Sequence, residues 1–301
     1  MNISFRQLRL FLALADTGSV SAAAARMHVT QPTASMQLKE MAEAVGLPLY
    51  EVISRKVYLT DAGEQLARTA RGISDQWEAF EQGIAAAKGL TRGRLRVAVV
   101  STAKYFIPRL LGSFCDQHPD IDISLEVLNR DHVVHRLRAN SDDLYVMSMP
   151  PEDLALEDHI LMPNPLVLIA PISHPCIDHK DLTLQDVVQS RFILRERGSG
   201  TRMATELWFK QMGFAPPKWL ELGSNEAIKE SVASKLGIAL LSRHALGPQA
   251  DPRIAELNVT GLPIPSQWHV VWPKGKQLSP IATVFYRHLL DQGQHQFHQK
   301  A

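Results

Sequence analysis

The stretch from Ala62 to about Lys88 constrains the fold of this 301-residue chain more than any other segment. It contains no proline, and its apolar residues recur at alternating steps of four and three, as in a heptad repeat. One long helix cannot bury such a stripe alone, so the helix must pack on a domain of its own chain or pair with a second copy. We favour pairing. The stripe contains Leu66, Ala70, Ile73, Trp77, Phe80, Ile84 and Ala87, and the candidate dimerisation residues are Leu66, Ile73, Trp77, Phe80 and Ile84.

The first sixty residues predict three short helices. The first has helical apolar spacing from Phe5 onward, and Gly18 is placed to end it. We expect Ser21 to cap an alanine-rich second helix, and Thr30 to cap a third that has Pro32 in its first turn. This order is typical of a helix-turn-helix, although a small helical bundle with no DNA role would share it.

The third helix and the segment after it carry side chains suited to DNA. Hydroxyls and amides near a helix N-terminus suit base edges in a major groove, and a lysine suits a phosphate. A short strand over residues 54–60 begins with two adjacent cations, which predicts a wing that reaches the DNA backbone or minor groove. The candidate DNA-binding residues are Ser21, Thr30, Gln31, Pro32, Thr33, Ser35, Gln37, Lys39, Arg55 and Lys56.

Strand and helix patterns alternate from about residue 95 onward, so this part predicts an α/β fold. Strands at 95–100, 121–128 and 144–147, with helices between them, predict a mostly parallel sheet. A second series starts at residue 166, and a late strand at 268–272 with a final helix returns to the first. We therefore expect two subdomains joined by two crossovers, about 93–163 with 268–301 and about 164–267, and a small-molecule site between them.

Three loops, which begin at Ser101, Arg195 and Gly223, are expected to converge on that site, because each follows a strand and opens a helix. Helix N-termini attract anions, and flanking cations favour a ligand with more than one negative charge, such as a phosphate ester. Turns and helix caps alone would explain the Gly-Ser-Gly-Thr loop equally well. The candidate effector-binding residues are Ser101, Thr102, Lys104, Asn129, Arg130, Arg195, Gly198, Ser199, Gly200, Thr201, Arg202 and Asn225.

Several segments of the chain resemble the LysR-type transcriptional regulators: residues 5–11, 18–24, 30–35 and 59–63. The loops at 101–106, 194–202 and 223–229 are similar to the branch of that family that controls Calvin-cycle carbon-fixation operons (CbbR-like). One position departs from the pattern: Val52 stands where the family often has arginine, which leaves Arg55 and Lys56 as the expected wing cations.

The resemblance implies a winged helix-turn-helix over 1–60, a linker helix and hinge over 61–92, and a periplasmic-binding-protein-like effector domain over 93–301. It implies a dimer through the linker helix, and a tetramer through further pairing of the effector domains. The expected partners are double-stranded DNA with an interrupted dyad and a small phosphorylated metabolite. Contact with RNA polymerase is left open.

Composition narrows the remaining classes of function. A net charge of +1 means that any DNA contact must come from a local patch. The start of the chain has no signal-peptide pattern, and no apolar run reaches membrane-spanning length, so we expect a cytoplasmic protein with no membrane partner.

An enzyme and a two-lobed solute-binding protein are the alternatives. The sequence has no Gly-x-Ser-x-Gly elbow, Walker loop or metal-ligand motif, so we expect no catalysis, no cofactor and no metal. The histidines of the 294–298 tail are more typical of a frayed end than of a metal site. Cys115 and Cys176 are expected to be thiols packed in cores, with a redox-sensing role as the alternative.

Overall fold

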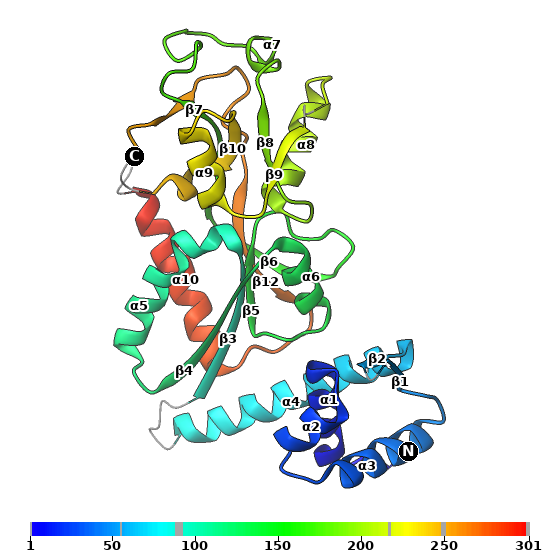
Figure 1. Cartoon of the computed structure of the whole chain (residues 1–301). Coiled ribbons are helices and arrows are strands. Elements are labelled where there is room, and N and C mark those ends of the chain that lie inside the picture. Colours follow the sequence, from blue (N-terminus) through cyan, green and yellow to red (C-terminus); the bar gives the residue numbers. More distant parts are fainter. Residues whose placement is uncertain (1, 55, 88–92, 216–217, 248–250, 299–301) are drawn as a thin grey trace. The chain divides into compact units, whose positions relative to one another are not determined.

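The computed structural model describes residues 2–54, 56–87, 93–215, 218–247 and 251–298. The chain divides into two compact units, a helical N-terminal unit and a larger α/β unit (Figure 1). Arg55 and residues 88–92, which include most of the expected hinge, lie outside the described residues.

The N-terminal unit is built from short helices around one apolar core, followed by a wing and a long helix. Its elements are α1 (Phe5–Thr17), α2 (Val20–Arg26), α3 (Gln31–Val45), β1 (Tyr50–Ile53), β2 (Lys56–Leu59) and α4 (Asp61–Ala87). Gly18 ends α1 in the left-handed conformation with φ of 60°, as its position predicts. The prediction that Ser21 caps α2 is wrong: Ser19 is the cap, and its hydroxyl accepts from the backbone N–H of Ala22. The helix therefore begins at Val20, two residues earlier than expected.

The wing is an antiparallel hairpin fixed to the start of α4. β1 pairs with β2, and the side chain of Thr60 donates to the carbonyl oxygen of Pro48 at 2.7 Å. Gly63 lies so close to the chain before the wing that a Cβ there would be 1.9 Å from the carbonyl oxygen of Leu49. Only glycine fits this approach, so the wing and α4 are coupled through backbone contact.

The apolar stripe of α4 divides into two parts. Ala70 is buried in the core of the N-terminal unit and Leu66 packs against that core. Further along, the side chains of Ile73, Trp77, Phe80 and Ile84 are exposed by 41–58%. Among the described residues, the core of the N-terminal unit covers the first part of the stripe, whereas the second part stays exposed, with the Trp77 ring 5.8 Å from the ring of Phe5.

The first lobe of the α/β unit is a five-stranded sheet of order β4-β3-β5-β12-β6. β3, β4 and β5 are parallel to one another, as the sequence predicts, whereas β12 runs antiparallel to both of its neighbours, β5 and β6. Its elements are β3 (Gly93–Val100), η1 (Ser101–Tyr105), α5 (Ile107–Gln117), β4 (Ile121–Leu128), α6 (Arg130–Arg138), β5 (Leu144–Met147), β6 (Leu156–Pro163), β12 (Gln267–Pro273) and α10 (Pro280–His298).

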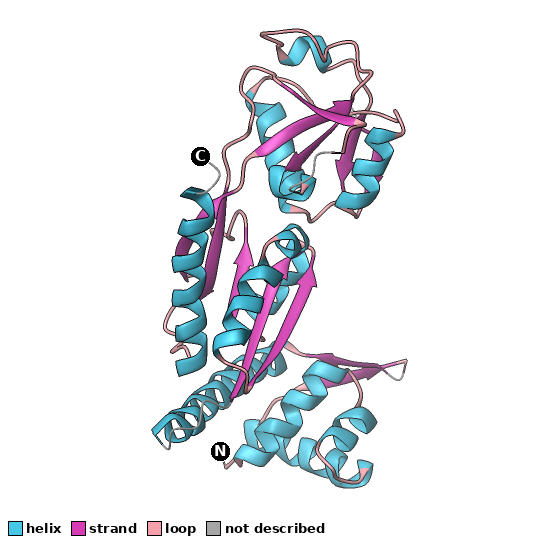
Figure 2. Ribbon diagram, turned by 90° about the vertical axis from the view of Figure 1, so that its left-hand side faces the viewer, coloured by secondary structure: helices cyan, strands magenta, loops and turns pink. Residues whose placement is uncertain are grey.

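The second lobe combines an antiparallel sheet of order β10-β7-β11 with a parallel pair, β8 and β9. The chain enters this lobe after β6 and leaves it before β12, and helices flank the strands in both lobes (Figure 2). Its elements are β7 (Leu166–Pro171), α7 (Leu184–Val187), β8 (Phe192–Arg195), α8 (Gly200–Gln211), β9 (Lys218–Leu222), α9 (Asn225–Ala233), β10 (Ala239–Ser242), η2 (Arg243–Leu246) and β11 (Ile254–Leu257).

The two cysteines differ in burial. Cys176 is half-buried against the core of the second lobe, but Cys115 is exposed, so the prediction that both pack in cores is wrong for Cys115. The reason is helical geometry: α5 turns Leu111 and Phe114 into the core, which leaves Cys115 on its outer face. Among the described residues, no helix is both long and apolar enough to span a membrane.

Candidate functional site

The N-terminal end of α3 presents a polar face to solvent. The Thr30 hydroxyl caps the helix by accepting from the backbone N–H of Thr33 at 3.4 Å, as predicted. Ala34, Leu38 and Met41 are fully buried and anchor the opposite face, also as predicted. Because its buried face is packed in the core, α3 holds its candidate DNA-binding side chains in fixed directions. Gln31, Pro32, Ser35 and Lys39 are exposed, and Thr33 and Gln37 are partly buried.

These exposed side chains form few hydrogen bonds or ion pairs with the rest of the protein. Lys39 makes one loose ion pair with Glu43, at 3.8 Å. Within the described residues, no hydrogen bond joins the side chain of Gln31 or Ser35 to another protein group. Ser21 on α2 and Lys56 on the wing are also exposed. Donors and acceptors on this face are thus available to an external partner.

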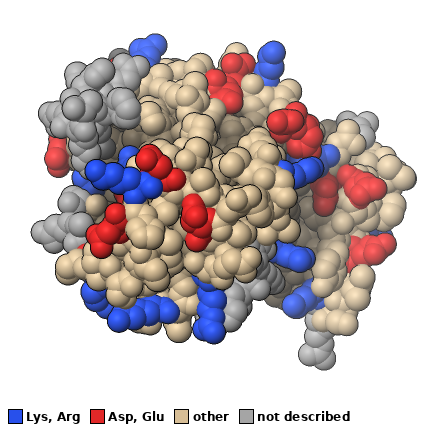
Figure 3. Space-filling model, turned by 90° about the horizontal axis from the view of Figure 1, so that it is seen from above, with Lys and Arg blue, Asp and Glu red and all other residues tan. Residues whose placement is uncertain are grey.

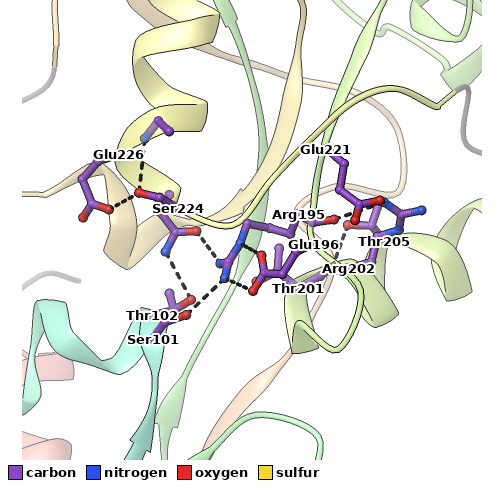
Figure 4. Close-up of polar contacts among 12 residues, drawn as sticks. Ser101, Thr102, Arg195, Glu196, Thr201, Arg202, Thr205, Glu221, Ser224 and Glu226 are labelled. Carbon is purple, nitrogen blue, oxygen red and sulfur yellow. Dashed lines mark hydrogen bonds and ion pairs between the residues drawn. The ribbon is translucent and has the colours of Figure 1, made fainter. Parts of the chain in front are cut away.

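A second polar cluster joins the two lobes of the α/β unit (Figure 4). Arg195, at the end of β8, donates to the hydroxyl oxygen of Ser101 at 3.1 Å and to the side-chain oxygen of Asn225 at 2.6 Å. Asn225, at the start of α9, donates in turn to the hydroxyl of Thr102 at 3.3 Å. Ser101 and Thr102 belong to the first lobe, and Arg195 and Asn225 to the second. The structure therefore brings together four of the twelve candidate effector-binding residues in one network of hydrogen bonds between side chains.

Arg195 is buried, with 3% of its surface exposed, and its charge is compensated by the neighbouring carboxylate of Glu196. That carboxylate accepts from Nε and Nη2 of Arg195 at 2.8 and 3.0 Å. Four hydrogen bonds thus occupy most of the five N–H donors of the guanidinium. An incoming anion would have to share or replace one of these partners.

Lys104, another candidate, lies in a neighbouring cluster around Glu226 near the start of α9. The Glu226 carboxylate accepts from Lys104 Nζ at 3.0 Å, from the Tyr105 hydroxyl at 2.5 Å and from the Ser224 hydroxyl at 2.8 Å. Burial raises the pKa of the Glu226 carboxyl, but these three hydrogen bonds outweigh that effect and lower the pKa to about 2. Burial and the bond to Glu226 raise the pKa of Tyr105 well above its ordinary value. At neutral pH the cluster is therefore a carboxylate held by three donors.

The Gly-Ser-Gly-Thr loop lies at another contact between the lobes. Gly198 has φ of +80°, and its carbonyl oxygen accepts from the backbone N–H of Asp131 at 3.3 Å. A Cβ at Gly198 would clash with the Asp131 side chain, and one at Gly200 would touch the Ser148 hydroxyl. Ser199 caps α8 through its backbone conformation. The loop thus packs closely on the first lobe.

The remaining candidates are held by protein groups. Arg130 donates twice to the carbonyl oxygen of Met149, at 3.0 and 2.8 Å, and the Asn129 side chain accepts from the N–H of His132. Arg202 is bonded to Glu206 and to the carbonyl oxygen of Arg195, and Thr201 is buried beside it on α8. These contacts support the alternative that turns and caps explain part of the loop pattern.

Sequence reasoning missed the acidic partners Glu196 and Glu226 and the Tyr105 hydroxyl. Glu226 and Tyr105 stood beside the quoted candidates Asn225 and Lys104, but their pairing joins residues 121 positions apart, and no local pattern reveals that. The face in Figure 3 shows cations and anions interspersed among uncharged side chains.

Among the described residues, no group of three or more His, Cys, Asp or Glu side chains could hold a metal.

Comparison with known proteins identifies the family. The model of the LysR substrate binding domain matches residues 88–294, and that of the bacterial regulatory helix-turn-helix protein, lysR family, matches residues 5–64. A RuBisCO operon transcriptional regulator of Acidithiobacillus ferrooxidans is 43% identical over 287 residues, which is 95% of this chain and 93% of that protein.

Two solved structures extend the comparison. The CcmR regulatory domain of Synechocystis PCC6803, in complex with 2-PG, is 42% identical with a TM-score of 0.65, and the match covers 67% of this chain and 98% of that one. Full-length CbnR, complexed with its target DNA, is 26% identical with a TM-score of 0.63 over 97% of this chain and 100% of that one. With both of its regions matched, this chain belongs to the LysR family of bacterial transcriptional regulators.

Proposed function

We propose that this regulator controls carbon-fixation genes in response to a small phosphate-bearing metabolite, such as 2-phosphoglycolate, that binds between the two lobes. The observation that carries the proposal is the network of Ser101, Thr102, Arg195 and Asn225, which is drawn from both lobes. The 2-PG held by the CcmR regulatory domain and the RuBisCO operon named for the relative support this choice of ligand and genes.

The network links ligand binding to a change in the protein. Its hydrogen bonds cross between the lobes, so a ligand that takes over some of them alters how the lobes meet. A ligand shifts such an equilibrium only as far as it binds one arrangement better than the other. The Ser101 and Thr102 hydroxyls would hydrogen-bond the ligand and Arg195 would supply positive charge. Lys104, Asn129, Arg130, Arg202 and the loop 198–201 would complete or support the site.

On the DNA side, α3 is proposed to read the major groove with Gln31, Pro32, Thr33 and Ser35, while Lys39 contacts a phosphate. Ser21, Thr30, Gln37 and Lys56 would support this face, and Arg55 would extend the wing. The exposed stripe of α4 would pair two chains, so that two such faces meet two half-sites of an interrupted dyad. Pairing of the α/β units would then give a tetramer.

In this proposal the protein works in the bacterial cytoplasm, acts by binding rather than catalysis, and needs no cofactor besides its effector. Contact with RNA polymerase would be the route to activation.

The proposal is tested by titrating the full-length protein with 2-phosphoglycolate, ribulose bisphosphate and glycolate in a calorimeter, followed by footprinting on the DNA upstream of its target operon. We expect at least one phosphate ester to bind and change the footprint, and glycolate, which lacks the phosphate, to do neither. If glycolate binds as tightly as 2-phosphoglycolate, or if no phosphate ester binds, the choice of ligand is wrong.

A further inference from the structure

We propose that Glu226 is an internal anion that occupies Lys104 and holds η1 against α9 until the phosphate of an effector replaces it there. The inference rests on the proposed function, because it concerns the same seam between the lobes. It adds a role for Glu226, which would set both the strength of effector binding and the contact between the lobes in the effector-free protein.

The contacts of Glu226 bridge the two lobes. Its carboxylate belongs to α9 of the second lobe, whereas Lys104 and Tyr105 belong to η1 of the first. Ser224 adds a third donor from the cap of α9. With one oxygen on Tyr105 and the other on Lys104 and Ser224, the carboxylate is ligated much as a bound phosphate or carboxylate would be.

Exposure distinguishes this cluster from the Arg195 network beside it. The side chain of Glu226 is 50% exposed and that of Lys104 36%, whereas that of Arg195 is 1% exposed. A solute can therefore reach the Lys104–Glu226 pair from water, and the carboxylate can swing away into solvent without leaving a buried charge. These are the properties needed in a contact that an effector breaks.

The charge of Glu226 determines whether it strengthens or weakens phosphate binding. Lys104 and Arg195 each face a carboxylate of the second lobe, Glu226 and Glu196, so both cations are neutralised before any ligand arrives. A phosphate that binds while Glu226 stays on Lys104 meets a like charge beside it, which disfavours the dianion. Binding with Glu226 displaced removes that repulsion and also breaks the bridge between η1 and α9.

The test compares Glu226→Gln with Glu230→Gln in the full-length protein. Glu230 is one turn further along α9 and pairs with Arg253 on the surface, so it offers the same substitution outside the cluster. By calorimetry, we expect Glu226→Gln to bind 2-phosphoglycolate about tenfold more tightly, since one charged hydrogen-bonding competitor is removed. Glu230→Gln should match the wild type. Tyr105→Phe, which removes one donor from the carboxylate, should shift affinity in the same direction by less.

A measurement without ligand tests the bridge itself. Hydrogen exchange of the backbone amides in residues 101–106 and 224–228 should be faster in effector-free Glu226→Gln than in the wild type or Glu230→Gln. Equal exchange in these three proteins would overturn the bridge.

The outcomes separate the two proposals. Weaker or unchanged binding in Glu226→Gln, with wild-type binding intact, overturns the competition: weaker binding would mean that Glu226 positions Lys104 for the ligand. If neither protein binds any phosphate ester, the proposed function fails and the competition fails with it.

Discussion

The polar face of α3 and the polar network between the lobes are built in opposite ways. On α3 the side chains of Gln31 and Ser35 are exposed and lie on a helix fixed by buried apolar residues. Between the lobes, Arg195 and Asn225 are buried and already bonded to groups of the same protein. A surface that binds a large, rigid partner can keep its hydrogen-bond donors exposed to water. A site for a small ligand instead contains internal partners that the ligand must replace, and this replacement is what can move the lobes.

The largest test of this comparison concerns the other open surface, the stripe on α4. Trp77→Glu places a charge among Ile73, Phe80 and Ile84, so we expect monomers in sedimentation. Loss of the second DNA-binding face should weaken binding to a full operator by about 100-fold or more, because paired binding gains that much from effective concentration. Gln76→Glu, an exposed neighbour, should remain dimeric and bind normally. A dimeric Trp77→Glu would show that the stripe is not the interface.

The next test concerns the close backbone contact between the wing and α4 at Gly63. Gly63→Ala would place a methyl group against the carbonyl oxygen of Leu49, and we expect it to lower the free energy of unfolding by about 3 kcal/mol. Gly72→Ala, in the same helix with no atom near its Cβ, should instead raise it by about 0.5–1 kcal/mol. Denaturant unfolding of both variants measures the difference. Equal effects would contradict a close contact between the wing and α4.

Local features and contacts between distant residues also differ in how well the sequence predicts them. Local patterns predicted the Gly18 stop, the Thr30 cap and the positions of strands β3, β4 and β5, because each of these depends on residues nearby in the chain. Four of the described strands were missed: β1 lies in the wing, where the sequence predicts a single strand, β6 is only partly buried, and β10 and β11 are runs of four residues without a distinctive pattern. Glu226 could not be assigned because its partner Lys104 lies 122 residues away, and acidic side chains are not expected in an anion site.

A smaller effect is expected on the α3 face. Gln31→Ala should reduce discrimination between operator base pairs by about tenfold, since a bidentate base contact contributes about 1–3 kcal/mol. Lys39→Ala should leave discrimination unchanged, weaken all sequences alike and reduce the slope of log affinity against log salt by about 1. Mobility-shift titrations at several salt concentrations measure both. A uniform loss in Gln31→Ala would mean that its side chain contacts the backbone rather than a base.

We expect a ligand to act on DNA binding through the network between the lobes, and Thr102→Val interrupts this network. The substitution removes the hydroxyl that receives the Asn225 hydrogen bond at nearly constant volume. Thr205→Val is the matched control, because that hydroxyl is also buried but donates to the carbonyl oxygen of Thr201 within its own helix. The measurement is footprinting of each variant with and without 2-phosphoglycolate. We predict that Thr102→Val binds the operator like the wild type but no longer changes its footprint with ligand, while Thr205→Val responds normally. A normal response in Thr102→Val, or loss of DNA binding in Thr102→Val alone, would contradict the claim.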